Sequence, residues 1–390
     1  MHEVKNIGLR GVEIADTRIS EVDGERGKLI YRGYDIEDLA KNSNFEETIY
    51  LLLYDTLPTG KELAVFREVL ASHRELPRGI IKHLERRKKT AHPMDVLQST
   101  VSMLPDFDRD ARTETRAANI EKSINLTAKM ATLVAYWDRI RKNLDIKEPD
   151  KELGHAANFL YMLKGEPQDA DIARDFEVSL ILHAEHSFNP STFAAREVAS
   201  TRAHMYACIG AALAALSGGL HGGVNTLVMK MLLEIDSTDR VEEWVKSKLE
   251  EGERIMGMGH AVYKSGDPRV RILSDISKRL AERSGNMKWY ELSRMIENVA
   301  RDEFRRHKGK EIYPNVDFYS ASIYYMMGIE PDLFTPVFAL ARTPGWCAHV
   351  IEEKFAEAAP GPVLYRPSAG YTGRYCGREV CRYVPIGERK

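Results

Sequence analysis

The 390-residue chain contains few cysteines, which limits the metal and redox chemistry that the sequence can support. The four are Cys208, Cys347, Cys376 and Cys381. The first two lie in apolar stretches with helical periodicity, where buried thiols are expected. The last two have no histidine pair nearby and are too few for a structural zinc site. We therefore expect no metal site, and this cysteine usage fits a reducing cytoplasm.

Long hydrophobic runs are also missing from the sequence. No stretch reaches the roughly 18 apolar residues that a membrane-spanning helix needs. Residues 1–11 carry charges early and no apolar segment of signal-peptide length. Residues 207–216 are apolar, but the stretch is short and favours a buried core helix. We expect a cytoplasmic protein with no membrane partner.

An excess of either charge is missing as well. Lysine and arginine number 56 and aspartate and glutamate 58, a balance that argues against a general nucleic-acid binder. The basic stretch 86–89 can be a phosphate patch, but cations suit a helix C-terminus, so a solvated helix end is favoured. The chain has no fixed-period repeat, which argues against a solenoid, and no low-complexity linker. Two domains, if present, must share a broad interface or exchange helices.

What the sequence does contain indicates a mostly α-helical fold. Hydrophobic residues make up 43% of the chain, which is enough for a core. Residues 12–20 and 28–32 are typical of two strands around an Asp-Gly step, and they predict an N-terminal β-hairpin. After them the apolar residues recur almost everywhere at helical spacing. The predicted helices are 44–53, 61–76, 92–104, 120–144, 169–186, 190–202, 204–216, 224–235, 240–251, 268–283, 289–306, 316–327 and 333–355.

Three segments in the second half of the chain place a titratable residue among glycines or at a turn. His221 lies between two glycine pairs in the segment 217–223. Glycine pairs are common at helix–helix turns, so this histidine can be incidental. Alternatively, a neutral imidazole here would donate a hydrogen bond to a developing oxyanion, because glycine lets a substrate come close.

His260 follows a Gly-Met-Gly step and is followed by Lys264, Arg269 and Arg271. Exposed backbone amides with cations nearby suit phosphates or carboxylates. A glycine-rich loop alone is a weak signal, and the histidine and the Asp-Pro-Arg step strengthen it. This segment therefore predicts an anion-binding loop with a histidine at one end.

Asp317 follows a Tyr-Pro-Asn-Val step at the start of an apolar helical run. One interpretation is a helix cap, which is a common use of aspartate. The other is a general base for a carbon-bound proton, which needs a carboxylate partly shielded from water.

His183 and His186 are three residues apart and are expected on one face of a helix, where substrate contact or core packing is favoured over zinc. Arg342 interrupts an apolar helix and must reach an anion or water. With Arg269 and Arg366 it would clamp a dicarboxylate through forked hydrogen bonds. Each arginine taken singly can instead be a surface ion pair.

Seven motifs follow one another along the chain: 31–36, 182–192, 219–223, 257–264, 267–269, 314–317 and 366–367. In residues and in order they resemble the citrate synthase family over nearly the whole length. The resemblance implies a mostly α-helical, two-domain fold and an obligate homodimer. The large domain would comprise residues 1–221 and 330–390, and a small, mobile CoA-side domain residues 222–329.

The implied reaction is the condensation of acetyl-CoA with oxaloacetate and water to citrate and CoA. It needs no cofactor, because the CoA thioester is a substrate. By the resemblance, Asp317 would remove a methyl proton, His221 would hydrogen-bond the enol or enolate oxygen, and His260 would polarise the oxaloacetate ketone. Oxaloacetate would be held by His186, Arg269, Arg342 and, from the other subunit, Arg366. CoA would contact Ile255, Met256, Gly257, Met258, Gly259, Lys264 and Arg271.

Two alternatives stay open. The segment 186–193 also resembles 2-methylcitrate synthases, which use propionyl-CoA, and one methylene in a pocket is worth only about 1–3 kcal/mol. We favour acetyl-CoA, because the segment 382–386 and the motif set look like the compact prokaryotic citrate synthases. A catalytically silent helical dimer that binds CoA is the second alternative, and the intact His221, His260 and Asp317 argue against it.

Overall fold

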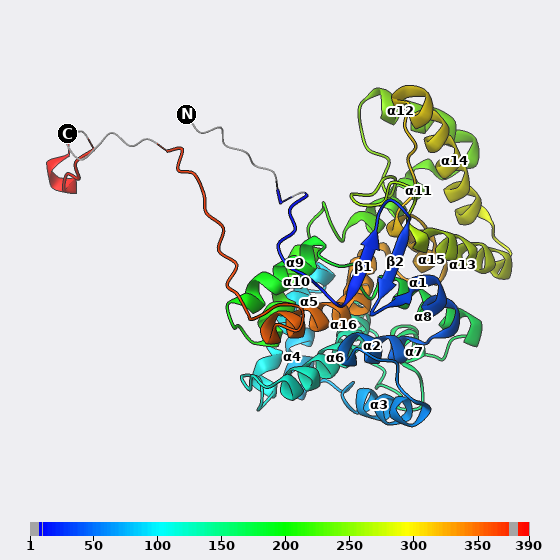
Figure 1. Cartoon of the computed structure of the whole chain (residues 1–390). Coiled ribbons are helices and arrows are strands. Elements are labelled where there is room, and N and C mark those ends of the chain that lie inside the picture. The colour runs from blue at the N-terminus through cyan, green and yellow to red at the C-terminus, as the bar shows by residue number, and fades with distance from the viewer. Residues whose placement is uncertain (1–7, 10, 374–380, 390) are drawn as a thin grey trace.

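The computed structural model describes residues 8–9, 11–373 and 381–389. Three short strands come first, β1 (Ser20–Asp23), β2 (Lys28–Tyr31) and β3 (Tyr34–Asp35). The α-helices of the described chain are α1 (Ile36–Asn42), α2 (Phe45–Tyr54), α3 (Gly60–Ser72), α4 (Arg78–Arg86), α5 (Pro93–Val101), α6 (Arg116–Arg141), α7 (His155–Lys164), α8 (Ala170–His183), α9 (Pro190–Ser200), α10 (Met205–Leu216), α11 (Val224–Ile235), α12 (Val241–Glu250), α13 (Pro268–Ser284), α14 (Lys288–Lys308), α15 (Val316–Met326) and α16 (Phe334–Phe355). The predicted mostly α-helical fold with a small N-terminal hairpin is confirmed (Figure 1).

The hairpin is shorter than predicted, and its first strand begins where the predicted strand ended. β1 pairs antiparallel with β2, from Ser20 opposite Tyr31 to Asp23 opposite Lys28. The prediction of a strand over residues 12–20 was wrong for most of its length. Val12 and Ile14 are 44% and 37% exposed, so the apolar alternation there covers no core.

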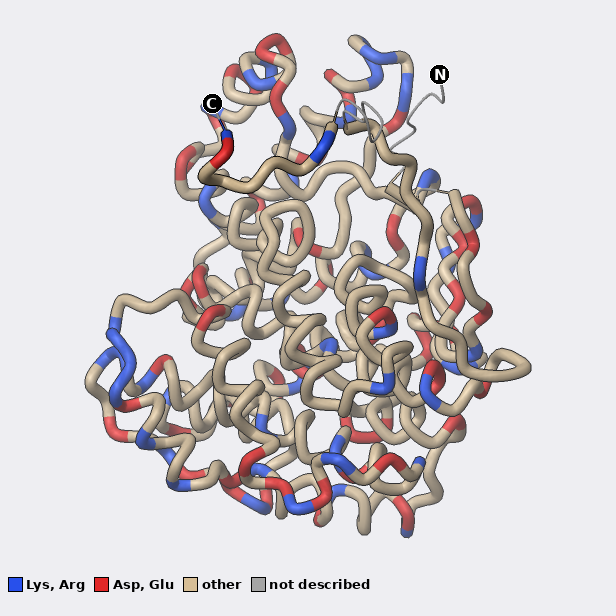
Figure 2. Tube along the Cα trace, turned by 90° about the vertical axis from the view of Figure 1, so that its left-hand side faces the viewer, with Lys and Arg blue, Asp and Glu red and all other residues tan. Residues whose placement is uncertain are grey.

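Helices α6 and α16 form the centre of the core. Both have buried residues on all sides, and α16 is buried along almost its full length. Because both helices are buried on all sides, they lie inside the protein rather than on its surface. Helices α9 and α10 pack against each other and against α16, so the predicted core helix 207–216 is confirmed as part of α10. Charged residues of both signs lie mainly on the outer segments (Figure 2).

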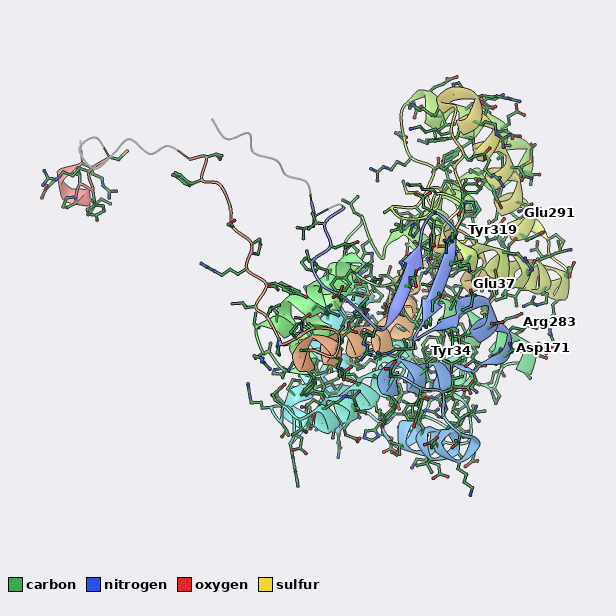
Figure 3. The ribbon with its side chains drawn as sticks, viewed as in Figure 1. Tyr34, Glu37, Asp171, Arg283, Glu291 and Tyr319 are labelled. Atoms are coloured by element: carbon green, nitrogen blue, oxygen red, sulfur yellow. The ribbon has the colours of Figure 1, made fainter. Side chains whose placement is uncertain are left out.

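Helices α11 to α15 form the upper part of the molecule as drawn in Figure 1. Among them, α13, α14 and α11 pack against α15. The proposed division into residues 1–221 with 330–390 and residues 222–329 stays a prediction. Helix α13 of the second group contacts α8 of the first, and Arg283 and Asp171 form an ion pair across that contact at 2.8 Å (Figure 3).

Several local predictions can be compared with the structure. Helix α8 ends at His183, so His186 lies beyond the helix, and the prediction that the two histidines share a helix face was wrong. The chain turns there because Asn189 caps the next helix, α9. Helix α4 ends at Arg86, which confirms the interpretation of the basic stretch 86–89 as a helix end.

Cys208 and Cys347 are buried free thiols, as predicted. Cys381 is disulfide-bonded, a state that the expectation of a reducing environment did not anticipate. Cys376 lies outside the described residues. In the part of the chain that the structure describes, no helix combines the length and the apolar character needed to cross a bilayer.

Candidate active site

A pocket of about 570 Å³ brings together residues that are far apart in the sequence. Its walls come from the loop between α8 and α9, the turn between α10 and α11, the segment after α12, and helices α13, α15 and α16. Six of the predicted catalytic and oxaloacetate-binding residues line it: His186, His221, His260, Arg269, Asp317 and Arg342. The sequence motifs therefore meet in one cavity.

Asp317 is the second residue of α15 and faces this pocket. The helix cap is Asn315, whose side chain accepts a hydrogen bond from the backbone N–H of Asp317, so Asp317 itself is not the cap. Asp317 is 8% exposed, and its Oδ1 is buried with no hydrogen-bond partner among the described residues. Burial raises the pKa of this carboxyl to about 7, although Arg269 opposes the shift. A carboxylate of this kind suits proton abstraction near neutral pH.

His221 lies in the turn between α10 and α11 and is held by Ser191 at the start of α9. The Nε2 atom of His221 is 3.3 Å from the backbone N–H of Ser191 and 2.8 Å from its hydroxyl. Because a backbone N–H can only donate, Nε2 is an acceptor and the ring proton lies on Nδ1. Burial, with a smaller effect from Arg342, lowers the pKa of His221 to about 4. The ring is therefore neutral at pH 7 and can donate from Nδ1.

His260 is held as the opposite tautomer to His221. Its Nδ1 accepts hydrogen bonds from the backbone N–H groups of Val262 at 3.0 Å and Tyr263 at 3.1 Å. The ring proton is therefore on Nε2. Burial, with a smaller effect from Arg269, lowers the pKa of His260 to about 4. The rings of His221 and His260 are thus both neutral, and each has one N–H left to donate.

The glycines before His260 let its loop lie against the segment that leads to Asp317. Gly257 has φ +76° and Gly259 φ +89°, a region that favours glycine. A Cβ on Gly257 would lie 2.8 Å from Val228 and 2.9 Å from Phe318. The two segments are joined by hydrogen bonds from Gly259 N to Tyr313 O and from Asn315 N to Gly257 O. The segments that carry Asp317 and His260 are therefore hydrogen-bonded to each other through their backbones.

Two arginines supply positive charge in different ways. Arg269 is 2% exposed and forms a fork with Asp267, through Nε to Oδ1 at 2.8 Å and Nη2 to Oδ2 at 2.6 Å. Arg342 is 1% exposed, donates from Nε to the carbonyl of His183, and lies over the Phe338 ring. Burial lowers the pKa of Arg342 to about 10, so it remains charged at pH 7. Among the described residues, no carboxylate lies at hydrogen-bonding distance from Arg342, and a buried cation of this kind is suited to an anionic ligand.

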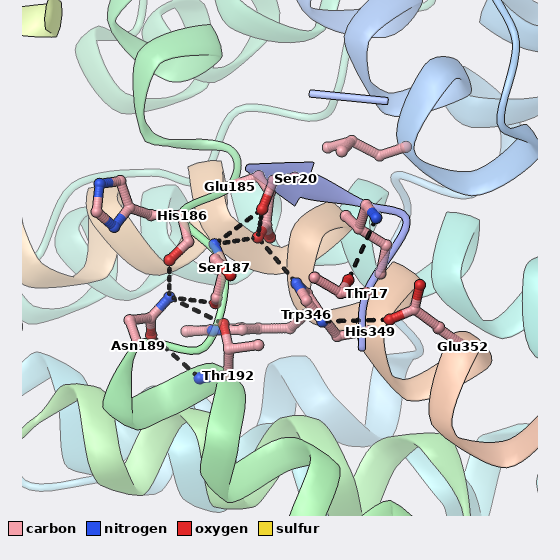
Figure 4. Close-up of polar contacts among 12 residues, drawn as sticks. Thr17, Ser20, Glu185, His186, Ser187, Asn189, Thr192, Trp346, His349 and Glu352 are labelled. Carbon is pink, nitrogen blue, oxygen red and sulfur yellow. Dashed lines mark hydrogen bonds and ion pairs between the residues drawn. The ribbon is translucent and has the colours of Figure 1, made fainter. Parts of the chain in front are cut away.

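His186 lies in the loop between α8 and α9, next to His260. Its Nε2 is 3.2 Å from the hydroxyl of Tyr263, and its ring centroid is 5.3 Å from that of His260. Glu185 fixes this loop to the core, because its carboxylate accepts hydrogen bonds from Ser20 at 2.9 Å and from His349 at 2.8 Å (Figure 4).

Sequence reasoning missed the residues that orient these groups. Tyr263 contacts His186, Asp267 fixes Arg269, and Ser191 fixes His221. The Asp-Pro-Arg step hinted at the second of these contacts, because Asp267 caps α13 two residues before Arg269. Nothing local in the sequence pairs Ser191 with His221, since thirty residues separate them.

Arg366 and the predicted CoA contacts Lys264 and Arg271 do not line the main pocket. Arg366 is exposed. It follows Tyr365, which packs against Phe193 of α9, and beyond this point the segment after α16 runs away from the helices of its own chain (Figure 1). Lys264 is exposed, forms an ion pair with Glu25, and borders a neighbouring pocket of about 300 Å³ that also contains Gly259 and His260. Arg271 borders a third pocket, which adjoins the second one because both are lined by Gly266, Asp267, Tyr313 and Pro314.

The rest of the predicted CoA segment is buried or partly buried. Ile255 and Gly257 are buried, whereas Met256 and Met258 are partly exposed. Met258 forms an isolated bridge with Pro314. Only Gly259 of this segment borders the main pocket directly.

This arrangement is suited to one class of chemistry. A buried carboxylate with a pKa near neutrality can take a proton from carbon, and neutral N–H donors can stabilise the oxyanion that forms. The nearby cations can hold a carboxylate substrate. The combination fits proton abstraction next to a carbonyl, followed by attack on a second, anionic substrate.

Comparison with known proteins agrees with this chemistry. The family profile described as "Citrate synthase, C-terminal domain" matches residues 8–368. The chain belongs to the citrate synthase family. A citrate synthase of Haloferax volcanii is 44% identical over 387 residues, which cover 98% of each chain.

Other members of the citrate synthase family extend the comparison. The 2-methylcitrate synthase 1 of Corynebacterium glutamicum is 43% identical over 389 residues, with 98% of each chain covered. The solved ternary complex of a Thermoplasma acidophilum citrate synthase with carboxymethyl coenzyme A and oxaloacetate matches with a TM-score of 0.90, 31% identity and 100% of both chains covered. Because relatives with both names are similarly close, membership of the family does not decide which acyl group the chain uses.

Proposed function

We propose that this protein condenses acetyl-CoA with oxaloacetate and water to give citrate and CoA. The observation that carries the proposal is Asp317, a buried carboxylate with an unpartnered oxygen in a pocket shared with two neutral histidines. A thioester α-proton is weakly acidic, so removing it needs both a base and a preorganised donor for the oxygen. The reaction needs no resident cofactor, because the thioester itself supplies the activated group.

In this proposal the three catalytic residues have separate tasks. Asp317 takes a proton from the acetyl methyl group, and the Nδ1–H of His221 donates to the enolate oxygen that develops. The Nε2–H of His260 donates to the ketone of oxaloacetate, whose carbon is then attacked by the enolate carbon. The neutral state of both rings supports these roles, because each keeps one N–H for donation. Water then hydrolyses the citryl thioester to citrate and CoA.

Oxaloacetate would be held by Arg269, Arg342 and His186, and by Arg366 of a second copy of the chain. Arg366 is exposed and does not line the pocket of its own chain, which supports a contribution in trans. The protein would then act as a homodimer with shared sites. Mixing an Arg366→Ala variant with an Arg269→Ala variant should restore activity in mixed dimers, and absence of rescue would refute the shared site.

CoA would lie along the loop 255–259 and reach Lys264. The neighbouring pocket that contains Lys264 and Gly259 supports this path. Arg271 borders an adjoining pocket that shares Gly266 and Tyr313 with this one, which supports a CoA contact at the far end of the same path. No nucleic acid or membrane is involved in the reaction, and we propose that the protein works in the cytoplasm.

The experiment that tests the proposal is an assay of CoA release with acetyl-CoA and with propionyl-CoA, each in the presence of oxaloacetate. We expect a higher kcat/KM with acetyl-CoA, and citrate as the product. A marked preference for propionyl-CoA would indicate a 2-methylcitrate synthase instead. Binding of CoA without release from either thioester would indicate a catalytically silent dimer.

A further inference from the structure

The tip of the N-terminal hairpin touches the segment that carries His260. The turn 24–27 joins β1 and β2, and the hairpin extends from the core toward α11 (Figure 1). The backbone carbonyl of Gly24 accepts a hydrogen bond from the backbone N–H of Lys264 at 2.9 Å. This contact joins residues 240 positions apart, and the CoA contact predicted for Lys264 does not account for it.

The contact is close enough to require glycine. A Cβ built on Gly24 would lie 2.3 Å from the carbonyl oxygen of Val262, and one on Gly27 would lie 2.9 Å from that of Gly266. The obstructing atoms are backbone, so they cannot turn aside as a flexible side chain would. The hairpin turn therefore presses directly on the main chain of residues 262–266.

That main chain also fixes the imidazole of His260. Val262 donates its backbone N–H to Nδ1 of His260, while its carbonyl lies against Gly24. The neighbouring residue, Tyr263, donates a second N–H to the same ring nitrogen. A displacement of Val262 by the hairpin would therefore weaken one of the two hydrogen bonds that fix the orientation and the tautomer of the ring.

We propose that the hairpin turn is a positioning element for His260, and that Gly24 is its central residue. The turn holds the backbone around Val262 so that His260 keeps its Nε2–H directed to the substrate. Gly24 itself does not touch the substrate. The inference rests on the proposed function for the role of His260, but the contact can be tested without activity.

An ion pair between Glu25 and Lys264 accompanies the backbone contact. Both side chains are more than 70% exposed, so the pair adds little to the free energy that holds the turn. The backbone contact of Gly24, rather than this ion pair, is then the main support. The two contributions can be separated by substitution.

The test compares Gly24→Ala with Gly60→Ala. An alanine Cβ at position 60 would meet nothing within 4 Å, so this variant controls for the substitution itself. Hydrogen exchange followed by mass spectrometry would report on the amide of Lys264, and steady-state kinetics on citrate formation. For Gly24→Ala we expect exchange at Lys264 to accelerate at least tenfold and kcat to fall about tenfold, with the KM for acetyl-CoA changed less. Gly60→Ala should match the wild type in both.

Two further variants keep the proposal testable if Gly24→Ala folds poorly. Replacing residues 24–27 by a two-residue Asn-Gly turn shortens the hairpin and should give the same two effects without a clash. Glu25→Gln removes only the ion pair and should change kcat less than twofold. Unchanged exchange at Lys264, or faster exchange with an unchanged kcat, would overturn the proposal. A wild type that forms no citrate would instead refute the proposed function, and the exchange rates would still decide whether the contact exists.

Discussion

Two aspartates at the starts of two helices show how similar burial can produce opposite chemistry. Asp267 at the start of α13 is 6% exposed, and Asp317 at the start of α15 is 8% exposed. Burial acts to raise the pKa of both. For Asp267, the charge and the forked hydrogen bonds of Arg269 more than offset burial and hold the pKa below its usual value. Asp317 forms no such ion pair with any residue that the structure describes, and its pKa rises to about 7.

The difference shows that a partner, rather than burial alone, decides what a buried acid does. Asp267 is an ionised structural group that fixes the guanidinium of Arg269. Asp317 keeps an oxygen without a hydrogen bond, which makes its carboxylate a base of useful strength. Changing each residue to asparagine should therefore have different consequences, which are described below in order of size.

The largest effect is expected for the activity of Asp317→Asn. Loss of the base should lower kcat by about 10³–10⁴-fold, because general-base catalysis contributes up to this order. Oxaloacetate affinity, measured by calorimetry, should change less than threefold, since the contacts proposed for that substrate are retained. An equal loss of affinity and turnover would mean that Asp317 binds the substrate rather than removing a proton.

The next effect is a loss of stability in Asp267→Asn. This change leaves the buried charge of Arg269 without its counter-ion, which typically costs about 3–5 kcal/mol. Urea unfolding at pH 7.5 measures the difference in free energy. A variant as stable as the wild type would show that Arg269 finds another partner, and the comparison of the two aspartates would lose its basis.

Asp317→Asn should change stability in the other direction. The folded-state pKa of Asp317 lies above its unfolded value, so the folded protein binds more protons and loses stability as pH rises from about 4 to 7. Asparagine removes this cost, and at pH 8 the variant should be more stable by up to roughly 4 kcal/mol. At pH 4 the two proteins should differ little. Thermal unfolding at both pH values would reveal the trend, and a destabilised variant at pH 8 would contradict it.

The smallest predicted effect concerns the pH dependence of the wild type. Because Asp317 must be ionised to accept a proton, kcat/KM should fall about tenfold per pH unit below pH 7. His221 and His260 are neutral above about pH 4, so they should not add to this fall. Circular dichroism at each pH would exclude unfolding as the cause. A flat profile down to pH 5 would show that the base has an ordinary pKa.

The two aspartates also show how far the sequence could predict the site. The motifs around His221, His260 and Asp317 were sufficient to select residues that meet in one pocket. The choice between cap and base for Asp317 was undecided, because both Asn315 and Asp317 are residue types that cap helices. The structure places the cap at Asn315, so the cap interpretation was wrong, and the role of Asp317 as a base stays a prediction.

The contacts between distant segments could not be predicted. The fork between Asp267 and Arg269 is local and was within reach of the sequence, but the hydrogen bond from Ser191 to His221 depends on the packing of α9 against α10. The first strand was misplaced for a related reason. Alternation of apolar residues marks a strand only where one face is covered, and residues 12–18 have no such cover.

The most direct test of the account is the pKa of the Asp317 carboxyl in the folded protein. Infrared difference spectra between the wild type and Asp317→Asn, recorded from pH 4 to pH 9, would follow the protonated carboxyl band of this one residue. The account predicts a midpoint near pH 7. A midpoint near pH 4 would mean that the carboxylate is solvated or paired in solution, and Asp317 would then lack the property on which the proposed chemistry depends.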